Sequence, residues 1–179
     1  WKEILTDIQK ERLEKKGIEW LSWYYDFYEK SFQEPFFVEY DFRPKNVVFE
    51  GIPLTGKIDK IIRITDTEAP LFSREEVAIV DYKTGAIKYR GEMKWIDKDG
   101  NILPWFEKGK YFRQLLFYKL LSEEDKEFSS HYEVKKLMLD FAEWRGGKYS
   151  IADIDFTLEE YENFKILVKE SWQKISNLD

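Results

Sequence analysis

Residues 77–85 read VAIVDYKTG, an apolar run that ends in an acid and a base two positions apart. Because side chains alternate across a strand, Asp81 and Lys83 share one face with the alternate apolar residues, and Tyr82 points to the other. We expect Gly85 to turn the chain sharply into a loop. That places the pair at the carboxyl end of a strand, where open α/β sheets bind ligands. An ordinary ion pair at a strand end, or two charges that reach water, is the alternative.

Asp59 is a second acid inside a strand-forming run, GKIDKIIRI (residues 56–64). Aspartate is disfavoured in strand interiors, so this position indicates a partner such as a cation. If the two strands pair, Asp59 and Asp81 approach each other and repel unless one is protonated or a divalent cation lies between them. Oxygen ligands suit Mg²⁺ or Mn²⁺, and a lysine beside the metal can orient a water or neutralise a phosphate. The alternative for Asp59 is a β-bulge or an edge position that faces solvent.

The composition limits the class of protein. A chain of 179 residues, 43% of them hydrophobic, can bury one core and is expected to form a single domain. The absence of cysteine excludes disulfides, thiolate zinc sites, a cysteine nucleophile and a cysteine-held iron–sulfur cluster. The net charge of -6 argues against DNA binding by bulk electrostatics, although a local basic groove stays open.

The chain ends and the apolar runs lead to two expectations about its context. No apolar run approaches the roughly 20 residues of a membrane span, and the first residues lack the layout of a signal peptide, so a cytoplasmic protein without membrane contact is expected. The chain starts at Trp1 rather than Met, which we interpret as a piece of a longer protein.

The pattern of elements predicts an α/β fold, a mixed sheet flanked by helices. Helical patterns cover residues 2–31, which Gly17 is expected to divide, and residues 111–124. The first of these regions has an apolar stripe at Ile18, Leu21, Tyr25, Tyr28 and Phe32. A capping box at Thr157 and Glu160 opens a last helix, whose apolar face is formed by Tyr161, Phe164, Val168, Trp172 and Ile175. Three strands, at residues 36–42, 46–51 and 52–64, are expected to form an antiparallel meander before the strand at 77–83. Two more strands are expected after the second helix, at residues 135–144 and 148–154.

Three short motifs carry a resemblance to a known family. Residues 56–59 (GKID), 81–85 (DYKTG) and 114–118 (QLLFY) resemble the GxxD, DYKTG and QxxxY motifs of RecB-like nucleases, in the same order. These enzymes belong to the PD-(D/E)XK superfamily and include nuclease domains attached to recombination helicases of the RecB, AddA and AddB type. The resemblance spans roughly residues 37–118. It implies a restriction-endonuclease-like core and a single nuclease domain over residues 1–179, interpreted as the C-terminal fragment of a longer protein.

The resemblance also implies roles for single residues. Asp59 and Asp81 would bind the catalytic Mg²⁺ or Mn²⁺ with the backbone carbonyl of Tyr82, and Lys83 would be the catalytic lysine. Glu39 is similar to an acidic residue that many relatives carry before the GxxD motif, and simple surface exposure is its alternative.

The resemblance further implies that Gln114, Tyr118 and Thr84 support the metal ligands or bind DNA. Gln114 and Tyr118 are four apart on a helix and face the same way. Their alternative is a half-buried helix face, with Tyr111 and Leu121, that packs on the sheet.

Two features depart from the family pattern. RecB-like nucleases usually have a metal-binding histidine on a helix upstream of these motifs, but the only histidine, His131, follows them and is expected to be an ordinary surface or strand-end residue. The expected histidine could lie on a segment outside this chain. The absence of cysteine separates the chain from relatives that carry an iron–sulfur cluster, and it leaves the proposed catalytic residues unaffected.

The sequence therefore predicts a metal-dependent deoxyribonuclease, the nuclease module of a DNA repair or recombination helicase. Its partners would be DNA and a helicase domain or subunit. A predicted hairpin at Asp99-Gly100 lies within an insertion after Gly85 whose basic and aromatic residues could assist strand entry or simply cover a neighbouring helix; they are Lys88, Tyr89, Arg90, Lys94, Trp95 and Trp105. Two other functions stay open: a catalytically inactive nuclease fold that serves as a DNA-binding scaffold, and an interaction module within a larger helicase.

Overall fold

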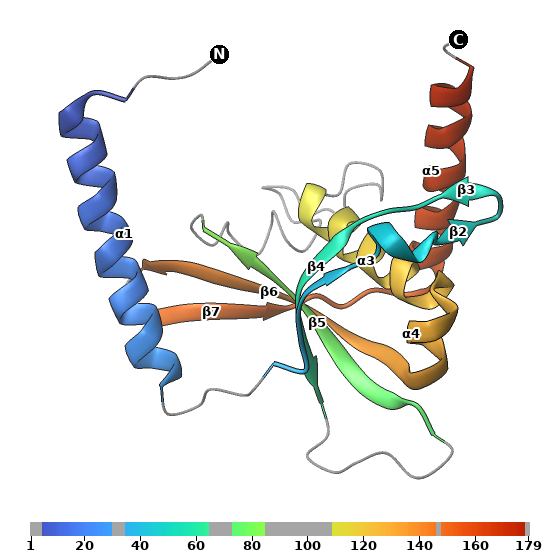
Figure 1. Ribbon diagram of the computed structural model, residues 1–179, viewed down its shortest axis with the longest axis horizontal. Coiled ribbons are helices and arrows are strands. Elements are labelled where there is room, and N and C mark those ends of the chain that lie inside the picture. The colour runs from blue at the N-terminus through green and yellow to red at the C-terminus, as the bar shows by residue number, and fades with distance from the viewer. Residues whose placement is uncertain (1–4, 30–34, 65–72, 85–108, 146–147, 178–179) are drawn as a thin grey trace, which may run out of the picture.

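The computed structural model describes residues 5–29, 35–64, 73–84, 109–145 and 148–177, and its centre is a five-stranded mixed sheet of order β1-β4-β5-β6-β7 (Figure 1). β5 and β6 are parallel, and the other neighbours are antiparallel. The predicted α/β class with a mixed sheet is confirmed. The strands are β1 (Phe37–Asp41), β4 (Lys57–Arg63), β5 (Glu75–Lys83), β6 (Tyr132–Arg145) and β7 (Lys148–Asp153).

β5 is the central strand because its apolar run is buried on both faces. Residues 77–80 are at most 4% exposed. A continuous apolar run of this kind is typical of a strand that is covered on both sides. The crossover from β5 to β6 contains α3 (Lys110–Glu124) and α4 (Lys126–His131), and α5 (Leu158–Ser176) packs on α3. Figure 1 shows these helices on one side of the sheet and α1 (Asp7–Tyr28) on the other.

The expected three-stranded meander is wrong. β1 pairs directly with β4, while β2 (Val48–Phe49) and β3 (Ile52–Pro53) form a separate two-stranded sheet. Glu50 and Gly51 have φ of 46° and 83°, so two residues with positive φ close this hairpin, which is the conformation of a type I′ turn. The hairpin leaves the sheet because its apolar side chains, Phe49 and Ile52, are buried in the core instead of continuing the strand order.

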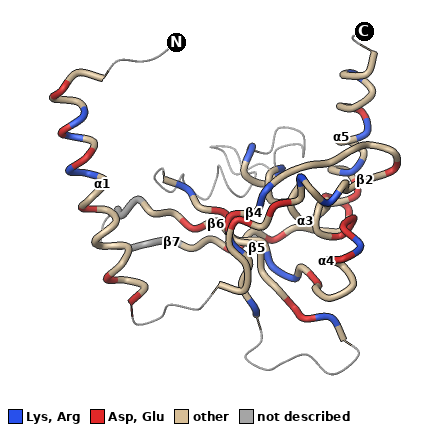
Figure 2. Tube along the Cα trace, viewed as in Figure 1, with Lys and Arg blue, Asp and Glu red and all other residues tan. Residues whose placement is uncertain are grey.

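Gly17 does not divide the N-terminal region, because α1 runs continuously from Asp7 to Tyr28. One glycine costs a helix about 1 kcal/mol, too little to end a helix of this length. Thr6 caps α1 with Gln9 in a capping box, and Figure 2 shows acidic and basic residues alternating along its first turns. α1 has no buried residue, and the apolar stripe expected on it is largely exposed: Ile18, Leu21 and Tyr25 are 61%, 67% and 65% exposed.

The predicted strands β6 and β7 and the last helix are confirmed. Thr157 and Glu160 form the predicted capping box of α5. Tyr161 and Phe164, on the predicted apolar face, are buried. The predicted hairpin at Asp99-Gly100 and its basic and aromatic residues lie outside the described residues. Within the described ranges, no helix is long and apolar enough to span a membrane.

Candidate active site

Asp59 and Asp81 are neighbours at one end of the antiparallel β4–β5 ladder. Lys60 pairs with Val80 and Ile61 with Ile79, so the next step of the same register places Asp59 beside Asp81 on the same face. The backbone N–H of Tyr82 donates a hydrogen bond of 3.0 Å to Oδ2 of Asp59 and ties it to the end of β5. The structure thus brings together the two acids that the sequence singled out.

Gln114 of α3 connects the acid and the base at the end of β5. Its side-chain nitrogen donates to Oδ1 of Asp81 at 3.0 Å, and its oxygen accepts from Nζ of Lys83 at 2.8 Å. Lys83 also forms an ion pair with Asp81. Tyr118 accepts from the same amide nitrogen at 2.7 Å and donates to Oδ1 of Asp81 at 3.4 Å. Residues four apart on one face of α3 therefore contact the acid and the base at the end of β5. The ring centroid of Tyr111 lies 4.6 Å from Nζ of Lys83.

The electrostatics of Asp81 are set by its burial. Its side chain is only 2% exposed, and burial raises the pKa of its carboxyl group above the ordinary value. The ammonium of Lys83 opposes that rise in pKa, whereas the negative charge of Asp59 adds to it. Two carboxylates that repel each other in a poorly hydrated place are stabilised by a cation. The ammonium of Lys83 is one such cation. The two carboxylates could also bind a metal cation.

The donor atoms at this place fit a hard divalent cation. Asp59 and Asp81 offer carboxylate oxygens, and the carbonyl of Tyr82 lies between Asp81 and Lys83 in the chain. Oxygen donors of this kind suit Mg²⁺ or Mn²⁺, which keep several water ligands. In the described part of the chain, no group of three or more acidic, histidine or cysteine side chains gathers in a way that could hold a metal. Side-chain ligation would therefore rest on two carboxylates.

Glu39 does not join the two aspartates. In the β1–β4 register it lies across from Asp59, between the pairs Val38–Lys60 and Tyr40–Ile58, but its φ of 54° departs from strand geometry. Its carboxylate forms an ion pair with Lys57 and is 61% exposed. The structure thus matches the exposed alternative for Glu39 and does not place it among the metal ligands.

Two other residues considered from the sequence are exposed. Thr84 is exposed directly after β5. His131 is exposed at the end of α4, where its Nδ1 lies 2.9 Å from the carbonyl oxygen of Glu127. His131 is therefore the ordinary surface residue that its place in the sequence predicted.

Gly56, the first residue of the GKID motif, allows β4 to approach α3. A Cβ atom at this position would lie 2.7 Å from Cδ1 of Leu121, which is fully buried, and 3.6 Å from Cε1 of Phe117. Real Cβ atoms do not come that close. The motif glycine is thus explained by packing against the helix that carries Gln114 and Tyr118.

Sequence reasoning missed a second buried acid, Asp140 of β6. It is 2% exposed and accepts hydrogen bonds from the hydroxyl groups of Tyr24 at 2.6 Å and Tyr28 at 3.0 Å, both from α1. It pairs in register with Tyr82, so its side chain lies on the face opposite Asp81. The signal was available, because Asp140 interrupts an apolar strand run in the same way as Asp59.

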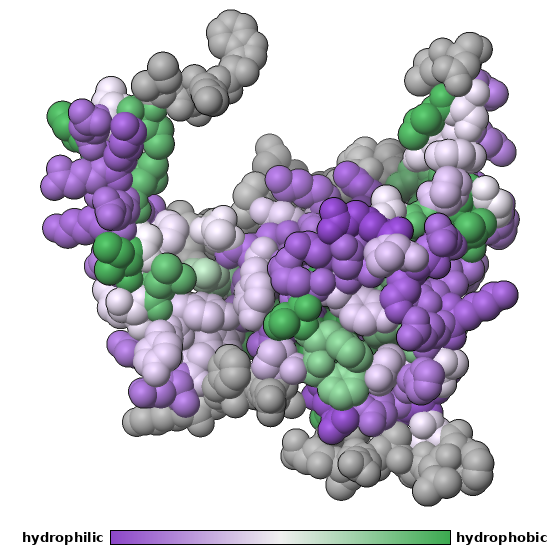
Figure 3. Space-filling model, viewed as in Figure 1, coloured by the Kyte–Doolittle hydropathy of each residue, from purple (hydrophilic) through white to green (hydrophobic). Residues whose placement is uncertain are grey.

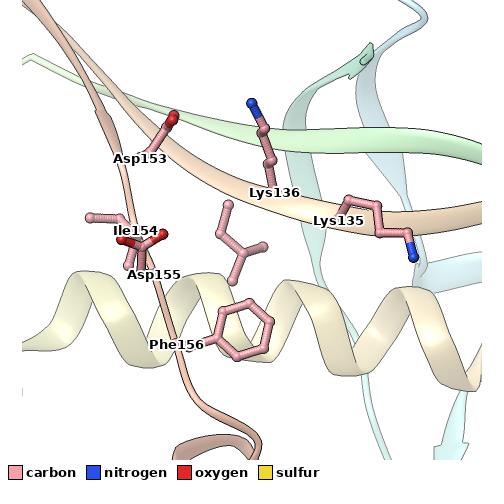
Figure 4. Close-up of a pocket in the computed structure, with 7 residues that line it drawn as sticks. Lys135, Lys136, Asp153, Ile154, Asp155 and Phe156 are labelled. Atoms are coloured by element: carbon pink, nitrogen blue, oxygen red, sulfur yellow. The ribbon is translucent and has the colours of Figure 1, made fainter. Parts of the chain in front are cut away.

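A hollow of about 230 Å³ lies elsewhere, between β6 and the segment that follows β7 (Figure 4). Lysines and aspartates of opposite charge share its lining with Phe156 and two aliphatic residues. None of its lining residues belongs to the three motifs. It is therefore separate from the acid pair.

Comparison with known proteins gives one match. The model of the PD-(D/E)XK nuclease superfamily matches residues 2–178. Neither the curated proteins nor the solved structures contain a match. The family match extends well beyond the three motifs, into α1 and α5.

Proposed function

This chain belongs to the PD-(D/E)XK nuclease superfamily, and from this we propose that it is a Mg²⁺- or Mn²⁺-dependent deoxyribonuclease of the RecB-like type. The observation that carries the proposal is the set of contacts through which Gln114 joins Asp81 and Lys83 beside Asp59. The RecB-like subtype rests on the order of the GKID, DYKTG and QLLFY motifs. We extend the proposal to residues 1–179 as one nuclease domain.

Asp59 and Asp81, with the carbonyl of Tyr82, would hold the divalent ion. When bound, the ion would acidify a water and stabilise the negative charge of the phosphate. Lys83 orients the attacking water and offers positive charge to the phosphate oxygens. The side-chain oxygen of Gln114 accepts a hydrogen bond from the ammonium group of Lys83. This bond would keep Lys83 beside the substrate when its ion pair with Asp81 is broken.

Gln114 and Tyr118 position the reacting groups rather than act on the substrate themselves. The amide nitrogen of Gln114 and the hydroxyl of Tyr118 both donate to Oδ1 of Asp81. They fix the direction of this carboxylate, and its other oxygen, Oδ2, is paired with the ammonium of Lys83. Asp81 would hold the metal through this oriented carboxylate.

The biological setting is proposed from the resemblance alone. RecB-like domains act beside helicases in DNA repair and recombination, so we propose a helicase domain or subunit as the partner, DNA as the substrate and the cytoplasm as the location. Because the net charge is -6, local basic groups on the surface would bind the DNA strand, rather than the charge of the chain as a whole.

One observation favours a second function, a catalytically inactive nuclease fold that binds DNA as a scaffold. The described residues offer two carboxylates and no histidine at the acid pair. A scaffold needs neither a bound metal nor the ammonium of Lys83.

Calorimetric titration of Mn²⁺ followed by cleavage of end-labelled single-stranded and duplex DNA separates the two functions. The informative variant is Lys83→Met. Lys119→Met is its matched control, because the two lysine side chains are 13% and 12% exposed and each is paired with an acid. We expect Mn²⁺ binding in the parent chain and a loss of cleavage of at least about 10²-fold in Lys83→Met only. Mn²⁺ binding without cleavage, or equal cleavage in both variants, would favour the scaffold.

A further inference from the structure

A groove of about 520 Å³ opens beside the acid pair, between the β2–β3 hairpin, α3 and α5. Most of its lining is apolar. Aromatic rings from two helices take part, Phe117 of α3 and Trp172 of α5, and Trp172 is 38% exposed. Figure 3 shows apolar side chains gathered along α5. The groove thus offers ring faces and aliphatic surface to a ligand that has apolar faces of its own.

The charged lining of the groove is entirely basic. Lys110 and Arg113 are the charged side chains among its described lining residues, in a chain with 35 acidic and 29 basic residues. The remaining polar groups are neutral, such as Thr55 and Ser171. The groove is therefore complementary to an anion, although the chain as a whole is acidic.

The groove is continuous with the proposed catalytic residues through Gln114. This side chain lines the groove and also contacts Asp81 and Lys83. Lys110, Gln114 and Phe117 follow one another at helical spacing along α3, so one helix edge borders both places. A strand whose phosphate lies at Asp81 would continue directly into the groove.

We propose that this groove binds the unpaired nucleotides of a DNA strand next to the phosphate that is cut. Lys110 and Arg113 would contact backbone phosphates, and Phe117 and Trp172 would stack on bases. Base faces are available in this way only in a single strand or a frayed end, because in a duplex they stack on each other. The proposal rests on the proposed function and narrows its substrate class to DNA with an unpaired segment.

Binding can be tested without cleavage, which separates this proposal from the nuclease activity. The probe is a fluorescein-labelled oligo-dT single strand, compared with a duplex of the same length, and anisotropy is measured in EDTA at several salt concentrations. We expect the parent chain to bind the single strand more tightly than the duplex. The double variant Lys110→Gln/Arg113→Gln should reduce the slope of log K against log salt by about 1.4, the value for two phosphate contacts on a single strand.

Trp172→Ala tests the stacking and should weaken single-strand binding by about tenfold, the lower part of the range for one stacked base. Lys165→Gln is the control: this lysine lies on α5, pairs with Glu162, and does not line the groove. Circular dichroism establishes that each variant is folded. Unchanged single-strand binding in folded groove variants would overturn the proposal. A chain that self-associates through Trp172 and binds duplex as tightly as single strand would also overturn it. If the groove variants weaken single-strand binding but the parent chain cleaves no DNA, the proposed DNA-binding groove is supported and only the proposed nuclease activity is rejected.

Discussion

Asp81 and Asp140 are two aspartates with the same burial and different partners. They lie on the neighbouring parallel strands β5 and β6, each 2% exposed, with side chains on opposite faces of the sheet. Burial is the largest cause that raises the carboxyl pKa at both positions. Asp81 forms an ion pair with Lys83 and accepts a hydrogen bond from the amide of Gln114. Asp140 instead accepts hydrogen bonds from the hydroxyl groups of two tyrosines.

Because the burial of the two aspartates is the same, their partners are what distinguishes them. Under the proposed function, Lys83 would exchange its ion pair with Asp81 for a substrate phosphate, and its hydrogen bond to Gln114 would keep it near. Tyr24 and Tyr28 are parts of α1, so any movement of theirs moves a helix that has no buried residue of its own. We infer that Asp81 serves chemistry and that Asp140 anchors α1 to the sheet.

The largest expected effect comes from exchanging each acid for its amide. Asp81→Asn should lower cleavage by at least about 10²-fold, because an amide cannot supply the negative oxygen that a metal requires. Asp140→Asn is the matched control, a buried aspartate one register step away, and should keep cleavage within about threefold because it lies on the other face. End-labelled DNA in Mn²⁺ gives both rates. Equal losses in the two variants would break the comparison.

Gln114→Leu should lower cleavage by about 10- to 100-fold, the usual cost of losing a group that orients a metal ligand. The affinity for Mn²⁺, measured by calorimetry, should weaken in the same variant, a change that a purely structural role for Gln114 would not produce. Tyr28→Phe removes one donor from Asp140 and should leave both quantities unchanged. If Tyr28→Phe weakens Mn²⁺ binding as Gln114→Leu does, the two faces are not independent.

The double variant Tyr24→Phe/Tyr28→Phe should lower the free energy of unfolding by about 1–3 kcal/mol, because it leaves a buried carboxylate without its donors. Amide hydrogen exchange should accelerate in α1 and stay unchanged in α3. In an Asp140→Leu background the same two substitutions should cost little, since no unsatisfied acceptor remains. A similar cost in both backgrounds would contradict the role of Asp140 as the anchor.

The smallest effect is a pH dependence. Because the pKa of Asp140 is raised above its ordinary value, this carboxyl group is more protonated in the folded chain than in the unfolded chain between these two pKa values. Its contribution to stability is therefore fully present below the ordinary pKa and is lost as pH rises through the raised one. Urea unfolding from about pH 3.5 upward should show a free energy of unfolding that falls, relative to Asp140→Asn, through this window. Since Asp81 titrates in both proteins, the difference isolates Asp140; a difference that rises with pH would contradict the sign.

Much of the fold and of the candidate site could be predicted from local patterns. The apolar run of β5, the capping box at Thr157 and the spacing of Gln114 and Tyr118 are local patterns, and each indicated its element correctly. The pairing of β4 with β5 then brought Asp59 beside Asp81. The roles of these residues in metal binding and catalysis stay predictions.

The rest depends on contacts between distant segments. The meander was expected because β2 and β3 read as strands, but each has only two paired residues, and burial of Phe49 and Ile52 in the core outweighed pairing with β1. The anchor of α1 depends on a hydrogen bond between residues 116 apart in the chain, from Tyr24 to Asp140. Neither residue stands in a motif that would have revealed the other.

The crossover between β5 and β6 has a consequence for how the protein could be divided. Residues 1–84 carry Asp59, Asp81 and Lys83, and residues 109–179 carry Gln114, Tyr118 and the parallel partner strand β6. A break in the chain between residues 85 and 108 would therefore split the candidate site into complementary halves. Their reassembly would require β5 of the first piece to pair with β6 of the second, so the proposed cleavage would report on fragment association. The topology that brings Asp81 and Gln114 together in space therefore also allows the two residues to be placed on separate molecules.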